Sequence, residues 1–328
     1  MRRILFVIFL FFAVASPAFA ADGRFTVMML LFRGITPAEQ GFMDYLKERL
    51  PVDFVIRDAE GKGARIAEHV AEAKRLRPDL IYAFGTSVTL AAVGAEGKID
   101  PARHITDIPV VFNIVADPIG SGLAKAFLPT GRNLTGVSHL VPIPDQIKTI
   151  RRFKPVKLVG VIYNPHEANS MLSVEELRRM AIEFEFGMTE APLQIPRGQQ
   201  PTAQDIETAM AALLAVKPDI VYLPSDSSLI RQAAVITEVA LNADIAVFSA
   251  TEDPVRKAGA LAGLVSNYYN AGTFAAHKAE QILRKSTTAE KTPIETLQRF
   301  SLVVNMRAAR RLGIFPPMDL IKIAELLK

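Results

Sequence analysis

The sequence predicts an α/β protein built as two lobes, each a doubly wound parallel sheet. Short apolar runs alternate with helical patterns along most of the chain, which is typical of parallel strands covered by helices on both faces. The alternation breaks over 137–146 and then resumes, and two stretches of the first half reappear in the same order in the second half. The length of 328 residues also exceeds one comfortable core, which favours two domains.

The first twenty residues have the layout of a secretory signal peptide. Arg2 and Arg3 precede the apolar run 4–14, and the small-residue segment 18–20 provides a cleavage site. That run is shorter than the roughly 20 residues that a membrane-spanning helix needs. We therefore expect cleavage after Ala20, with retention as a membrane anchor as the alternative.

Composition narrows the cellular setting and the partners. The chain has no cysteine, which excludes disulfides, a thiolate nucleophile, a lipid-anchored cysteine and a cysteine metal site. It has 38 basic and 34 acidic residues, and removal of the signal peptide takes away two arginines, leaving a net charge of about +2. We expect a soluble periplasmic protein that does not bind nucleic acid.

Each predicted lobe is a series of strands and helices. In the first lobe, strands are expected over 25–32, 52–57 and 79–85, helices over 37–50 and 64–76, and a further strand within 107–118. In the second lobe, strands are expected over 157–164, 188–193, 219–224 and 244–249, with helices over 174–186, 205–216 and 229–241. The segment 137–146 joins the lobes.

An internal repeat supports duplication of one α/β lobe. Residues 77–93 align without gaps on 217–233, and both stretches begin with a basic residue, proline and aspartate. Residues 107–118 then align on 244–254 with one deletion, at nearly the same separation. The alternative is that a basic residue, proline and aspartate commonly precede a strand that follows a helix.

The loops that follow the strands are the expected site. Ligands of open parallel sheets bind outside the carboxyl ends of the strands. These loops are rich in Ser, Thr, Asn and Asp, whose side chains and neighbouring helix N-termini suit a carboxylate or another small polar group. Helix capping is the alternative for any one of them. The residues that we expect to bind ligand are Phe32, Gly85, Thr86, Ser87, Asn113, Asp117, Tyr163, Asn164, Glu167, Asn169, Ser170, Ser225, Asp226, Ser227 and Glu252.

Specific roles follow from side-chain chemistry. We expect Glu252 or Asp226 to meet an ammonium group, and Thr86 and Ser170, together with Ser87 and Ser227, to hydrogen-bond a carboxylate. If Thr86 and Ser170 bind ligand, their replacement by alanine weakens binding and leaves the stability of the ligand-free protein unchanged. Loss of stability would identify them as caps.

Motifs of enzymes and metal sites are missing from the sequence. There is no G-x-S-x-G, no P-loop, no H-E-x-x-H, and no G-x-G-x-x-G after the first strand. Of the five histidines only His166 falls in a candidate loop, and no serine and acid accompany it by spacing. We expect no enzyme activity, no cofactor and no metal.

Several stretches together resemble one family. The segments DPIGSGLAKAFLPTGRNLTGVS, YNPHEANS, DIVYLPSDSSL, DPVRKAGALAGLVSNYYNAGTFAAHKAEQIL and VVNMRAARRLGI are similar to those of ABC-transporter substrate-binding proteins of the tryptophan/tyrosine type. The resemblance covers the chain from about Phe25 onward. It departs from the usual pattern at PSDSS and SNYYNAG, so tryptophan or tyrosine is not carried over as the ligand.

The resemblance implies a type I periplasmic binding fold with three crossovers between the lobes and a ligand cleft between them. We place the first lobe at 21–138 and 252–290, and the second at 139–251 and 291–328. It also implies a monomeric solute-binding component that hands a small amino-acid-like ligand to an ABC-type inner-membrane permease. The alternatives are a secreted α/β hydrolase or transferase and a ligand-presenting sensor protein.

Overall fold

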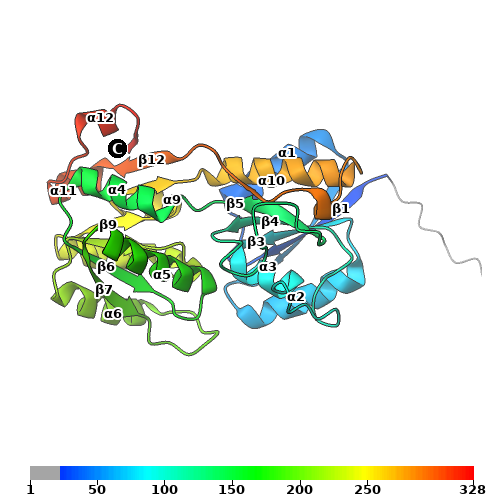
Figure 1. Cartoon of the computed structure of the whole chain (residues 1–328), viewed down its shortest axis with the longest axis horizontal. Coiled ribbons are helices and arrows are strands. Elements are labelled where there is room, and N and C mark those ends of the chain that lie inside the picture. The colour runs from blue at the N-terminus through cyan, green and yellow to red at the C-terminus, as the bar shows by residue number, and fades with distance from the viewer. Residues whose placement is uncertain (1–22) are drawn as a thin grey trace, which may run out of the picture.

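The computed structural model describes residues 23–328, so the predicted signal peptide lies outside the described residues. Two lobes lie side by side, each with a mainly parallel sheet between helices (Figure 1). The first sheet has the strand order β11-β5-β4-β3-β1-β2, and the second has the order β13-β12-β10-β9-β8-β6-β7. These two sheets confirm the predicted fold class.

The first lobe holds the elements β1 (Phe25–Leu31), α1 (Pro37–Arg49), β2 (Val52–Asp58), α2 (Gly63–Leu76), β3 (Leu80–Phe84), α3 (Gly85–Val93), β4 (Val110–Val115), β5 (Leu134–Ser138), α10 (Tyr268–Leu283) and β11 (Glu295–Thr296). The central strands β1, β3, β4 and β5 are almost entirely buried, because helices cover both faces of the sheet. The long helix α10 packs against α1 (Figure 1).

The second lobe holds α4 (Ile143–Phe153), β6 (Leu158–Tyr163), α5 (Ala168–Glu183), β7 (Gly187–Pro192), α6 (Ala203–Ala215), β8 (Ile220–Leu223), α7 (Ser227–Arg231), α8 (Ala233–Asn242), β9 (Ala246–Ser249), α9 (Glu252–Lys257), β10 (Ala262–Val265), β12 (Ser301–Asn305), α11 (Met306–Leu312), α12 (Met318–Ile321) and β13 (Glu325–Leu327). Strand β12 is antiparallel to β10, whereas the other pairings in this sheet are parallel. The predicted helix over 229–241 is divided between α7 and α8 at Gln232.

The chain passes between the lobes three times, as the resemblance implied. It crosses after β5, again between β10 and α10, and again between β11 and β12. The last two crossings fall later than the predicted boundaries at 252 and 290, because β10 extends the second sheet and β11 pairs with β5 in the first. Residues 252–266 therefore lie with the second lobe, and residues 291–296 with the first.

The internal repeat corresponds to equivalent places in the two sheets, since β2-β1-β3-β4-β5 and β7-β6-β8-β9-β10 have the same strand order. Arg77 and Lys217 both adopt a left-handed backbone at the end of a helix, with φ of 49° and 51°. The carboxylate of Asp79 accepts a hydrogen bond from the Thr26 amide, and that of Asp219 accepts hydrogen bonds from the backbone of 157–158. In both lobes, the basic residue of this motif thus ends a helix, and the aspartate anchors the strand that follows.

Candidate functional site

The predicted site residues lie at or just beyond the carboxyl ends of β1, β3, β4, β6, β8 and β9. Loops at these ends of the two sheets touch each other. The Gln200 side chain, beyond β7, donates a 2.6 Å hydrogen bond to the Gly61 carbonyl, beyond β2. On another part of the junction, a Cβ atom added to Gly120 would lie 3.0 Å from the Leu172 side chain. The two lobes are therefore in direct contact around the predicted site.

Asp226 is the centre of a buried network in the second lobe. Its side chain is fully buried and accepts hydrogen bonds from the Leu229 amide at 2.9 Å, the Asn164 amide at 2.9 Å and the Ser170 hydroxyl at 2.7 Å. Burial raises the pKa of Asp226 well above its usual range, and the negative charge of Glu167 adds to this effect. The carboxylate caps α7 and connects it to the loop after β6.

Glu167, at the start of α5, also accepts hydrogen bonds from the first residues of α7. Its carboxylate accepts hydrogen bonds from the amides of Ser227 and Ser228, both at 2.9 Å, and from the Ser228 hydroxyl. Asn169 donates to the Ser225 carbonyl. Most predicted polar residues of the second lobe are thus bonded to one another, which satisfies the backbone groups at the start of α7.

Glu252 is also bonded within the protein. One of its carboxylate oxygens accepts a 2.9 Å hydrogen bond from the Tyr268 amide, and the other lies 3.1 Å from Arg256 Nε. Arg256 pairs in turn with Glu325. The Tyr163 hydroxyl donates to Glu190 on β7. The hydrogen bonds that Glu252 and Asp226 make within the protein use the same carboxylate oxygens that we expected to bind the ligand. The internal contacts therefore compete with the expected ligand contacts.

The predicted site residues of the first lobe make fewer hydrogen bonds within the protein. Asn113 belongs to a buried chain in which the Tyr82 hydroxyl donates to Glu39 at 2.6 Å and accepts from the Asn113 amide at 3.3 Å. By contrast, the Thr86 hydroxyl makes no hydrogen bond with any described residue. Thr86 is nevertheless buried, with only 4% of the residue exposed. The remaining members are Phe32, buried at the end of β1, and Gly85 and Ser87, half-buried at the start of α3.

A backbone irregularity shapes the end of β4. Ile114 has a left-handed φ of 57°, which is rare for a β-branched residue, and the pairing of β4 with β5 shifts register between Asn113 and Val115. The Asn113 side chain supports this turn by accepting a hydrogen bond from the Ile114 amide at 3.0 Å. Strained backbone conformations of this kind are common at binding sites, because they set the direction in which the following residues project.

Four polar residues at the junction are not among the predicted site residues, and we call them the junction cluster: Arg33, His139, Thr251 and Tyr268. His139 and Tyr268 meet edge to face, with ring centroids 5.5 Å apart, and the Arg33 guanidinium lies 5.3 Å from the centroid of Phe84. Burial raises the pKa of Tyr268, whereas the Arg33 charge acts in the opposite sense, which indicates that the two side chains are near one another. The cluster joins the end of β1, the first crossover, the end of β9 and the start of α10.

Four atoms of the junction cluster are buried without a hydrogen-bond partner among the described residues: Arg33 Nε, His139 Nδ1, Thr251 Oγ1 and the Tyr268 hydroxyl. Leaving such a group unpaired costs about 1–3 kcal/mol. A cation–π contact such as that of Arg33 with Phe84 returns only about 0.5–1 kcal/mol at an exposed site. Thr251 stands at the N-cap position of α9, yet its side chain does not cap the helix. Internal contacts therefore do not account for these groups.

His139 is the neutral member of the junction cluster. Burial lowers its pKa to about 3, the Arg33 charge acts in the same direction, and the Val115 carbonyl acts against both. Its Nε2 lies 3.2 Å from the Ser225 hydroxyl. A neutral imidazole adds no second positive charge beside that of Arg33. The sequence signal for this cluster was Arg33, which stands among loop residues that are otherwise neutral or acidic.

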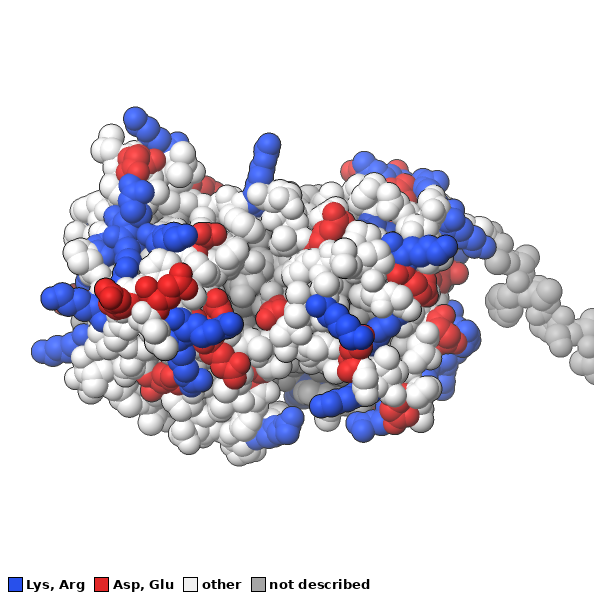
Figure 2. Space-filling model, viewed as in Figure 1, with Lys and Arg blue, Asp and Glu red and all other residues white. Residues whose placement is uncertain are grey.

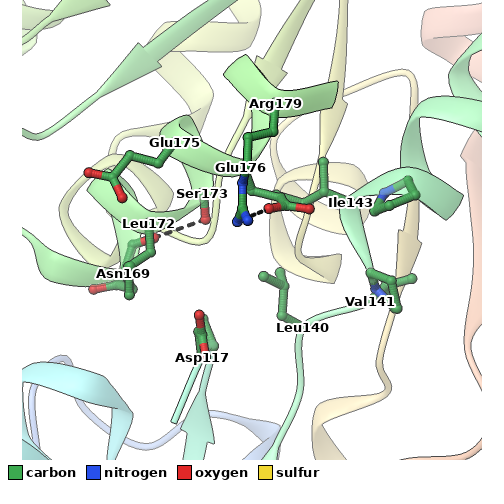
Figure 3. A pocket seen from close by; sticks show the side chains of 13 residues that line it. Asp117, Leu140, Val141, Ile143, Asn169, Leu172, Ser173, Glu175, Glu176 and Arg179 are labelled. Atoms are coloured by element: carbon green, nitrogen blue, oxygen red, sulfur yellow. Dashed lines mark hydrogen bonds and ion pairs between the residues drawn. The ribbon is translucent and has the colours of Figure 1, made fainter. Parts of the chain in front are cut away.

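A cavity of about 350 Å³ opens between α5, the first crossover and the end of β4, and its lining does not include the residues of the junction cluster. Figure 3 shows Asp117 entering from the first lobe, opposite Asn169 and Leu172 of α5, with Leu140 nearby on the crossover. Of the predicted site residues, only Asp117 and Asn169 line this cavity. Asp117 accepts hydrogen bonds from the amides of 119 and 120 and forms no ion pair with a described residue.

Charge is spread over the surface without a single dominant patch on the face that Figure 2 shows. Basic and acidic side chains alternate over both lobes there, and the strip between them is mostly uncharged. Within residues 23–328, no group of three or more His, Asp or Glu side chains is placed to hold a metal ion. No helix in that range has the length and apolarity required to cross a lipid bilayer.

Comparison with known proteins identifies the relatives of this chain. Residues 33–328 match the family described as ABC transporter substrate binding protein. The tyrosine-binding protein of Clostridioides difficile (strain R20291) is 27% identical over 230 residues, an alignment that covers 70% of this chain and 61% of that protein. The chain thus matches less than two thirds of the length of this curated relative.

Solved structures of similar fold extend over nearly the whole chain. A conserved domain protein from Vibrio cholerae O1 biovar El Tor is 27% identical with a TM-score of 0.81, covering 92% of this chain and 99% of that one. An ABC domain from Streptococcus pneumonia in complex with L-Trp is 23% identical with a TM-score of 0.79, covering 92% and 100%. At the latter identity the likeness concerns the fold.

Proposed function

Because this chain belongs to the ABC transporter substrate-binding protein family, we propose that it captures a small amino-acid-like molecule between its two lobes. In this proposal it acts in the periplasm as a monomer, after cleavage of the signal peptide following Ala20. It then delivers the ligand to an ABC-type permease in the inner membrane. The named relatives bind tyrosine and L-Trp, which supports an amino-acid-like ligand here.

The observation that carries the proposal is the set of unpartnered polar atoms in the junction cluster. Arg33 follows β1 of the first lobe and Tyr268 begins α10 of the same lobe, whereas Thr251 follows β9 of the second lobe. A ligand that bonds to groups of both lobes binds the closed arrangement more tightly than the open one. Such differential affinity is what a ligand needs to shift a protein toward closure.

Asp117 is the carboxylate that we propose for the ligand's ammonium group. Sequence analysis favoured Glu252 or Asp226, but the carboxylates of both are already bonded to groups of the protein. Asp117 lines the 350 Å³ cavity and has no cationic partner among the described residues. Thr86, Ser87 and Ser227 remain the proposed hydroxyl donors.

One contact favours a second candidate function, a hydrolase. Ser225 and His139 form a serine–histidine pair with 3.2 Å between Oγ and Nε2, which is the distance that a nucleophile and its base require. However, the pKa of His139 is lowered to about 3, so the imidazole is a weak base near neutral pH. No carboxylate of the described residues bonds to its other nitrogen. Binding without chemistry therefore remains our proposal.

The proposal is tested with the purified mature protein and a thermal-shift panel of the twenty amino acids, with sugars as a comparison class. A ligand at a hundredfold excess over its Kd adds about 2.7 kcal/mol of stability, which moves the Tm of a two-lobed protein by several degrees. We expect at least one amino acid to raise the Tm and Asp117→Asn to weaken that effect. A panel in which sugars alone raise the Tm would reject an amino-acid-like ligand.

A further inference from the structure

We propose that Arg33 is the anchor for the ligand's carboxylate, so that the molecule taken up between the lobes must carry a carboxylate beside an apolar or aromatic portion. This inference deepens the proposed function and rests on it. The relevant feature is an arginine at the end of β1 whose side chain forms no hydrogen bond or ion pair with any described residue.

The surroundings of Arg33 orient its guanidinium in a way that suits binding of a planar anion. Its guanidinium lies over the Phe84 ring, with 5.3 Å to the centroid, and its Nε atom is buried. A planar guanidinium matches a carboxylate through two parallel hydrogen bonds, and stacking on a ring reduces the freedom lost on binding. The Tyr268 hydroxyl adds a neutral donor that also lacks a partner.

The acids near the junction cluster do not neutralise Arg33. Glu252 pairs with Arg256, and Asp253 pairs with Lys257 at 3.0 Å. The buried Glu39 accepts hydrogen bonds from Thr36 and Tyr82. His139 is neutral near pH 7. Within the part of the chain that the structure describes, Arg33 therefore carries an uncompensated positive charge at the lobe junction.

Variants of Arg33 separate a ligand anchor from a structural residue. Arg33→Gln should lower the affinity for the best-binding amino acid by about 10- to 100-fold, because a charge-assisted pair is lost. The affinity of Arg33→Lys should lie between those of wild type and Arg33→Gln, since lysine retains the charge but loses the planar guanidinium. The Tm of the ligand-free protein should stay the same or rise. Arg103→Gln removes the same charge from an exposed loop of the same lobe and is the matched control.

The wild-type protein provides a test that does not depend on the variants. Titration calorimetry compares L-tyrosine, L-tryptophan and L-leucine with their decarboxylated amines (tyramine, tryptamine and isoamylamine) and with the matching deaminated acids. We expect binding by at least one amino acid or deaminated acid and a loss of at least tenfold for its amine. An amine that binds as tightly as its parent overturns the role of Arg33 while the proposed function stands. Binding by none of the nine compounds overturns this inference, and the panel of twenty amino acids then decides separately whether the proposed function stands.

Discussion

Ser170 and Thr86 were expected to behave alike, and the structure separates them. The Ser170 hydroxyl donates a 2.7 Å hydrogen bond to the buried carboxylate of Asp226, whereas the Thr86 hydroxyl makes no hydrogen bond with a described residue. Removal of a donor from a buried acceptor costs about 1–3 kcal/mol. The first residue therefore supports the fold, and the second remains available to a ligand.

The corresponding prediction is a contrast between two alanine variants. Ser170→Ala should lower the free energy of unfolding of the ligand-free protein by about 1–3 kcal/mol. Thr86→Ala should leave it within about 0.5 kcal/mol of wild type and should weaken ligand binding. Urea denaturation and ligand titration measure the two effects. Equal destabilisation by both variants would show that Thr86 also has a structural role.

His139 makes the stability of the protein depend on pH. Its pKa is lowered from 6.5 to about 3 in the fold, mainly by burial. Below about pH 6.5 the unfolded chain binds a proton that the folded chain does not, so stability is full above this pH and falls as pH decreases toward 3. The expected loss is about 2 kcal/mol between pH 6.5 and 4.5.

A histidine variant isolates this contribution from that of other groups. In His139→Gln the loss of stability between pH 6.5 and 4.5 should be smaller than in wild type by about 2 kcal/mol, whatever the absolute stability of the variant. His277→Gln removes an exposed imidazole and should retain the wild-type pH dependence. Parallel pH profiles of wild type and His139→Gln would contradict the burial of a neutral imidazole at this position.

At the scale of elements, the close packing of α1 and α10 depends on two glycines. A Cβ atom on Gly272 would lie 1.9 Å from the Ala38 carbonyl oxygen, and one on Gly41 would lie 2.2 Å from the Tyr269 carbonyl oxygen. Both distances are far shorter than van der Waals contact. Because α10 carries Tyr268 at its first turn, this packing also fixes one member of the junction cluster.

Gly272→Ala should therefore destabilise the protein even though alanine favours a helix by about 1 kcal/mol over glycine. The overlap is with backbone, which cannot move aside cheaply, so the expected net loss is about 1–3 kcal/mol. The matched control is Gly63→Ala at the start of α2, where no atom lies within 4 Å of the added Cβ. A Gly272→Ala variant as stable as wild type in urea would show that α10 can shift without cost.

At the scale of the whole molecule, the proposed function requires the lobes to hold a closed arrangement with ligand. The hydrogen bond from Gln200 to the Gly61 carbonyl, 2.6 Å long, joins the lobes without belonging to either core. Such a bond contributes about 0.5–1.5 kcal/mol net, and it is formed only when the lobes meet. It therefore favours closure and with it ligand retention.

Gln200→Ala should weaken binding of the amino acid selected by the thermal-shift panel by about two- to tenfold, mainly through faster dissociation. The stability of each lobe should not change. Gln194→Ala, whose side chain bonds only to the Pro192 carbonyl within the second lobe, is the control. Stopped-flow dissociation measures the effect, and equal dissociation rates for both variants would mean that this contact does not support closure.

The sequence alone was sufficient for the α/β class, the two lobes and most strands, whereas the position of the ligand site stays a prediction. These features depend on local hydrophobic periodicity and on the rule that parallel strands present their carboxyl ends at one edge. The repeated basic residue, proline and aspartate even marked equivalent strands, because each motif ends a helix and anchors a strand through contacts near it in the fold.

The tertiary structure decided which polar residues are free for a ligand. Asp226, Glu167 and Glu252 find partners tens of residues away or in a neighbouring element, and no spacing in the sequence encodes those contacts. Arg33 and Tyr268 are separated by more than two hundred residues, and the Arg33 charge acts on the Tyr268 hydroxyl only because α10 returns to the first lobe. Residue type is a local property, whereas an unpaired charge is a property of the folded surroundings. The sequence therefore indicated which residue types stand in the loops after the strands, and it could not indicate which of their groups stay unpaired.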